Sequence, residues 1–116
     1  MKFEDLEVWQ RSARLSADIY RALSSLKDYG FRDQITRSGL SIPSNIAEGF
    51  ERESIKDCNK FLSYAKGSCG ELRTQAFIGM DIGYIPKEIG HHWANEAKEL
   101  SAMLASLMRS RSKFLE

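Results

Sequence analysis

The residues of this chain that could bind a metal ion are few. Glu88 and His91 have the Glu-x-x-His spacing that places two ligands on one helix face in di-iron carboxylate bundles. Such a site needs a second Glu-x-x-His motif and a glutamate from each of two further helices. The only other histidine is His92, which on a helix points about 100° away from its neighbour. We therefore predict two solvent-exposed histidines, no metal site and no cofactor.

The two cysteines are the candidates for a reactive thiol, and both occur at apolar positions of a helical pattern. Cys58 and Cys69 are eleven residues apart. That spacing corresponds to about 16 Å along a helix, which is too far for a disulfide. Neither has a histidine nearby in the sequence that could act as a base. We predict buried, unreactive thiols, a reducing compartment and no enzymatic activity.

A second polar pattern surrounds the segment SGLSIPSNIAEGFERES, residues 38–54. Small serines and an asparagine, rather than long charged side chains, recur on one helix face, and they suit close contact with a neighbouring surface. The alternative is an ordinary solvated face. This polar face consists of Arg37, Ser41, Ser44, Asn45, Glu48 and Arg52.

Hydrophobic periodicity indicates the elements that must position these residues. The chain has 116 residues, 42% of them hydrophobic and 28% charged, which suits a single domain spanning residues 1–116. Because the connections are short, we predict an all-α fold, an antiparallel up-down four-helix bundle. The predicted helices run from Asp5 to Leu26, from Phe31 to Glu53, from Ser54 to Gly83, and from Pro86 toward the C-terminus, where the fourth helix frays.

Caps and one proline refine these helices. We predict Asp5 as the first N-cap, Ser54 with Asp57 as a capping box, and Gly83 as a C-terminal cap. Pro43 removes a backbone donor and presses on the turn before it, which costs about 3 kcal/mol in a helix interior. We predict a continuous second helix kinked at Pro43. The alternative is a break, with Ser41 or Ser44 capping a new helix.

Two features predict contacts beyond a single chain. The third helix carries Ser63, Gly67, Gly70 and Thr74 on one face, and each glycine costs about 1 kcal/mol relative to alanine. Two glycines on one face indicate that another backbone approaches, the alternative being a weakly specified solvent face. The first helix has two neighbouring apolar stripes, wider than one helix can cover. They are Val8, Leu15, Ile19, Ala22 and Leu26, and Leu6, Trp9, Ala13, Tyr20 and Leu23.

Nearly the whole chain resembles the 23S rRNA intervening-sequence proteins. The similar segments are LEVWQRSARLSADIY, YGFRDQITRSGLSIPSNIAEGFER and FLSYAKGSCGELRTQAFIGMDIGYI. The resemblance implies a four-helix bundle that assembles into a homopentamer, and the family's genomic context implies an association with RNA. The residues that match the family motif, and that we take as candidates for contacts between copies, are Ser41, Pro43, Ser44, Asn45, Glu48, Gly49, Gly67 and Glu71.

Two functional hypotheses follow. In the first, the chain is a homo-oligomer associated with structured RNA; in the second, it is an oligomeric scaffold that binds another protein and no nucleic acid. The formal net charge of +1 gives no general case for nucleic-acid binding. No apolar run suits a membrane span or a signal peptide, so we expect a cytoplasmic protein. The candidate phosphate contacts are Arg37, Arg52, Lys56, Arg73, Arg109, Arg111 and Lys113.

Overall fold

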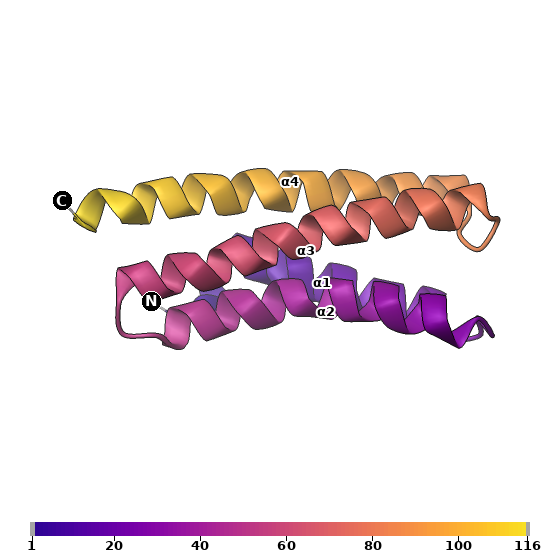
Figure 1. Cartoon of the computed structure of the whole chain (residues 1–116), viewed down its shortest axis with the longest axis horizontal. Helices are drawn as coiled ribbons and strands as arrows, with labels where there is room; N and C mark the ends of the chain where they lie inside the picture. The colour runs from indigo at the N-terminus through magenta and orange to yellow at the C-terminus, as the bar shows by residue number, and fades with distance from the viewer. Residues whose placement is uncertain (1, 116) are drawn as a thin grey trace.

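The computed structural model describes residues 2–115 and, for Leu115, the backbone alone. The described chain has four α-helices and no strand, which confirms the predicted four-helix bundle (Figure 1). The α1–α2 and α3–α4 connections lie at one end of the bundle, and the α2–α3 connection lies at the other end with both termini (Figure 1). The elements are η1 (Phe3–Asp5), α1 (Glu7–Ala22), α2 (Tyr29–Glu51), α3 (Ile55–Asp81), α4 (Lys87–Ser112) and η2 (Lys113–Leu115).

Two of the predicted helix caps are confirmed. The Ser54 side chain accepts a hydrogen bond from the backbone N–H of Asp57 at 3.0 Å and starts α3. Gly83 has a φ of +80°, and the N–H of Tyr84 donates to the carbonyl of Gly79 at 2.9 Å. This arrangement is a Schellman motif, in which the left-handed glycine lets the chain leave α3 and turn toward α4.

The predicted cap of the first helix is wrong. Asp5 belongs to the short 3-10 turn η1, and Leu6, which has no capping side chain, occupies the N-cap of α1. Packing fixes this start instead, because the rings of Phe3 and Trp9 lie 5.4 Å apart. The helix also ends at Ala22, earlier than predicted, and leaves that alanine exposed.

α2 continues through Pro43, as predicted, and the kink at that residue stays a prediction. The proline is buried, and Gly39, one turn earlier, allows α1 to lie close. A Cβ added at Gly39 would be 3.1 Å from Cδ1 of Ile19. The helix begins at Tyr29, two residues before the predicted start, because the Asp28 side chain accepts the N–H of Phe31.

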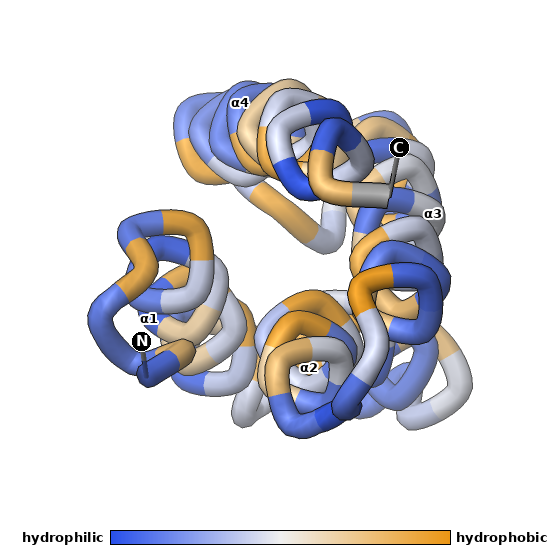
Figure 2. Tube along the Cα trace, turned by 90° about the vertical axis from the view of Figure 1, so that its left-hand side faces the viewer, coloured by the Kyte–Doolittle hydropathy of each residue, from blue (hydrophilic) through white to orange (hydrophobic). Residues whose placement is uncertain are grey.

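The four helices follow one another around the core in chain order (Figure 2). α3 packs extensively on both α2 and α4, whereas the contact between α1 and α4 is the least extensive of the four between neighbours. A charged cluster reinforces this weaker side, since the Arg11 guanidinium donates to the carboxylates of Glu96 and Glu99. None of the described helices combines the length and apolar character that crossing a membrane would need.

Candidate nucleic-acid interface

Most of the predicted phosphate contacts gather at one end of the bundle. α2 ends, α3 begins and α4 finishes at this end (Figure 1). Arg37 lies about four turns back along α2, and Arg73 lies in the middle of α3, so neither belongs to this group. The five cations at this end, which we name the basic end, are Arg52, Lys56, Arg109, Arg111 and Lys113.

Two arginines of the basic end are committed to contacts within the chain. Arg52 donates to Glu48 at 2.9 Å and lies 4.7 Å above the ring of Phe61. Arg111 is half-buried, lies 4.7 Å above the ring of Phe50, and has an Nε that is buried without a hydrogen-bond partner. These cation–π contacts make both side chains part of the packing between helices.

Arg109 and Lys113 are different, because they line a groove between α3 and α4. The groove has a volume of about 610 Å³, and Asn59 lines it from the α3 side. The Asn59 side-chain amide donates to the carbonyl of Met108 at 3.3 Å and to the hydroxyl of Ser112 at 2.9 Å. These bonds fix the two helices against each other beneath the exposed cations.

The buried thiol of Cys69 lies near two more cations of α3. Burial raises the pKa of Cys69 to about 12, and the positive charges of Lys66 and Arg73 oppose part of this rise. Burial also raises the pKa of the Cys58 thiol, and both cysteines are free and buried. The prediction that both thiols are buried is thus confirmed, and their raised pKa disfavours the thiolate, which is the reactive form.

His91 and His92 are both exposed, as predicted. Within residues 2–115, no group of three or more histidine, cysteine or acidic side chains is arranged to hold a metal ion.

Residues 4–106 match the model of a family described as 23S rRNA-intervening sequence protein. This chain belongs to that family. A crystal structure of a protein of unknown function from the S23 ribosomal protein family of Bacteroides thetaiotaomicron has a similar fold, with a TM-score of 0.81. The two sequences are 27% identical, and the match covers 87% of this chain and 97% of that one. No curated relative matches the chain.

Three of the residues that carry the resemblance to the 23S rRNA-intervening sequence family pack inside the protomer. The hydroxyls of Ser41 on α2 and Ser68 on α3 are hydrogen-bonded to each other, and Asn45 donates to the carbonyl of Ser41 at 2.8 Å. A Cβ added at Gly49 would be 3.0 Å from the carbonyl oxygen of Cys58. Ser41 and Gly49 therefore set how closely α2 approaches α3, and Asn45 bonds within α2.

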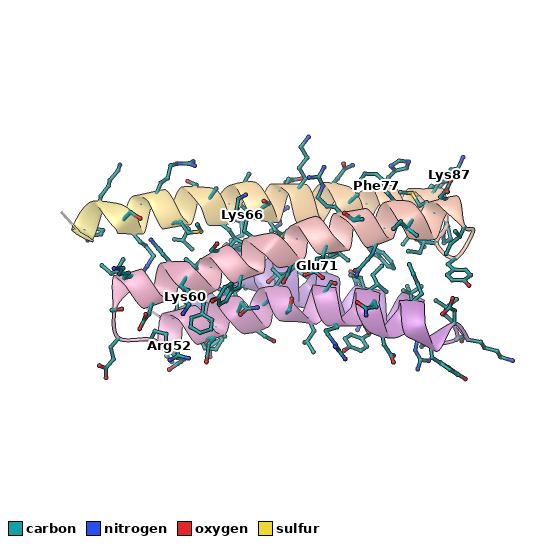
Figure 3. All side chains as sticks on the ribbon, viewed as in Figure 1. Arg52, Lys60, Lys66, Glu71, Phe77 and Lys87 are labelled. Carbon is teal, nitrogen blue, oxygen red and sulfur yellow. The ribbon has the colours of Figure 1, made fainter. Side chains whose placement is uncertain are left out.

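Other residues of the family motif are accessible. Ser44, Glu48, Gly67 and Glu71 are exposed, and Figure 3 shows Glu71 on the side of α3 that lies next to α2. A Cβ added at Gly67, or at its neighbour Gly70, would meet no atom of the chain within 4 Å. No helix of the same chain therefore accounts for these two glycines.

Two further cations lie on the α3–α4 side, Lys66 and Lys98, and neither was among the residues predicted from the sequence. Both are exposed, and Figure 3 shows Lys66 between the two helices. The available signal was helical spacing, because Lys66 precedes Arg73 by seven residues and Lys98 precedes Arg109 by eleven. Each interval is close to a whole number of helical turns.

Proposed function

We propose that this member of the 23S rRNA-intervening sequence family is a non-enzymatic homo-oligomer, a pentamer by analogy with its family, that associates with structured RNA. The observation that carries the proposal is the basic end. Within the described part of α4 and η2, residues 100–115 contain Arg109, Arg111 and Lys113 and no aspartate or glutamate. The last part of α4 is therefore positively charged although the net charge of the whole chain is only +1.

The outer face of α3 supports self-assembly. Tyr64 is 49% exposed and Ile78 is 48% exposed on the same helix as the open Gly67 and Gly70. Exposed glycines destabilise a helix, and inside the protomer no packing contact offsets that loss. A second copy of the chain that approaches this face would supply such contacts. A closed oligomer would then present several basic ends together, and weak single contacts would add up to useful avidity.

The proposal is tested by titrating a labelled RNA hairpin with the assembled protein at several salt concentrations. Because binding depends on displaced counterions, the logarithm of the association constant should fall linearly with the logarithm of the salt concentration. Undetectable binding, or binding that does not respond to salt, would reject the RNA association.

One observation favours an oligomeric protein scaffold without nucleic acid. Arg52 is paired with Glu48, and the exposed acids Glu51, Glu53 and Asp57 surround the same connection between α2 and α3. These carboxylates would repel a phosphate backbone and could bind a basic protein surface. Partners that remain bound after nuclease digestion in a pull-down would support this second function.

A further inference from the structure

We infer that the groove between α3 and α4 is a binding track for an RNA phosphate backbone. This inference rests on the proposed RNA association and extends it from the basic end along the molecule. The track uses Arg109 and Lys113 together with Lys66, Arg73 and Lys98.

The register of the two helices places these cations along the line where α3 meets α4, which continues from the groove. Asn59 contacts α4 near one end of α3, and a Cβ added at Gly90 of α4 would collide with the Met80 side chain near the other. Lys66 and Arg73 lie between these two contacts, and residues 59, 66, 73 and 80 follow one another at intervals of seven. Seven residues are nearly two turns, so each step rotates the helix face by only about 20°. Lys66 and Arg73 therefore also lie on the side of α3 that faces α4.

The same spacing applies to α4. Ala105 and Ser112 face α3, because Ala105 lines the groove and Ser112 bonds to Asn59. Lys98 precedes Ala105 by seven residues and thus shares their side. At roughly 1.5 Å per residue, Lys98 and Lys113 are about 22 Å apart along the helix. Cations spread over such a length suit an extended polyanion better than a single phosphate group.

The three acidic residues in the middle of these two helices point away from this groove. On α4, Glu96 and Glu99 accept hydrogen bonds from Arg11 of α1, on the opposite side of the helix. On α3, Glu71 lies one turn from Ser68, which is bonded to α2. The cations of the track consequently have no carboxylate among the groove positions 59, 66, 73, 98, 105, 109, 112 and 113.

Small residues lie beside the cations on α4, and one of them, Ala105, lines the groove. The others are Ser101 and Ala102. Phosphate contacts of this kind confer affinity and orientation without sequence specificity. The track would thus hold RNA by its backbone.

The test compares two double variants of the full-length protein. Lys66→Gln with Lys98→Gln removes two charges from the track. Lys60→Gln with Lys27→Gln removes two exposed lysines outside the track. Lys60 follows Asn59 directly and points about 100° away from it, and Lys27 lies in the connection between α1 and α2. Circular dichroism and sedimentation should show that both variants keep the helix content and the assembly state.

We expect the track variant to bind a labelled RNA hairpin more weakly and to lower the salt slope by about 2, one for each lost phosphate contact. The control variant should keep both the affinity and the slope of the wild type. Equal effects of the two variants would overturn the track while leaving the RNA association intact. Absence of binding by the wild type would instead overturn both proposals at once.

Discussion

At the scale of single residues, small polar side chains act mainly inside this protein. Ser41 and Asn45 were predicted from sequence to suit a contact with a neighbouring surface. Ser41 contacts Ser68 on α3 of the same chain, whereas Asn45 donates to the Ser41 carbonyl within α2. The sequence indicated the close contact and could not indicate its partner, since hydroxyl groups bond equally well within and between chains. Arg11 was not predicted from the sequence, because the two carboxylates to which it donates lie more than 80 residues away.

The ion pair between Arg11 and Glu96 leads to a pH-dependent prediction. The hydrogen bond from Arg11 lowers the pKa of Glu96. The pair should therefore stabilise the fold fully above the unfolded-state pKa of about 4.3, and the stabilisation should be lost as the pH falls through the lower folded-state pKa. Glu96→Gln should reduce the free energy of unfolding by about 1–2 kcal/mol at pH 7. Its difference from the wild type should shrink in strongly acidic solution.

Urea denaturation followed by circular dichroism at pH 7 and pH 3 measures this difference. Glu53→Gln, at an exposed position between α2 and α3, serves as the control and should leave the stability nearly unchanged at both pH values. A Glu96→Gln variant with wild-type stability at pH 7 would show that the pair is not stabilising.

At the scale of helices, the sequence predicted those helix ends that depend on a few neighbouring residues. The caps at Ser54 and Gly83 each depend on a single turn of the chain, and both act as the sequence indicated. The start of α1 depends on the contact between Phe3 and Trp9, and the hydrophobic pattern contains no sign of it. Register between α3 and α4 is also a tertiary property. For that reason the sequence alone did not distinguish Lys66 and Lys98 from other exposed lysines.

Gly67 allows the proposed self-contact of α3 to be tested without disturbing the protomer. A substitution at Gly79 would collide with Ile85, whereas the space at Gly67 is open. Gly67→Arg should keep or increase the helix content, because arginine is the better helix former by somewhat less than 1 kcal/mol. The long charged side chain should nevertheless block a second copy and shift the protein toward monomers in sedimentation equilibrium.

Ser25→Arg provides the matched control for this experiment. It adds the same side chain at an exposed position of the α1–α2 connection, away from the outer face of α3. The control should assemble like the wild type. If Gly67→Arg retains the wild-type mass, then the outer face of α3 is not the contact between copies.

At the scale of the whole molecule, the proposed function assigns self-assembly and RNA binding to two different surfaces. The outer face of α3 carries Gly67, Tyr64 and Ile78 and would contact a second copy. The basic end and the α3–α4 groove carry the cations and would contact RNA. Because the two surfaces occupy different sides of α3, one protomer can use both at the same time.

Sedimentation velocity of a labelled RNA hairpin mixed with the protein tests this account most directly, because the signal reports both RNA binding and the size of the bound species. The account predicts that at low salt the RNA moves with a protein oligomer, and that at high salt it is released while the oligomer persists. RNA that sediments alone at every salt concentration, beside a protein that remains monomeric at micromolar concentration, would contradict the account.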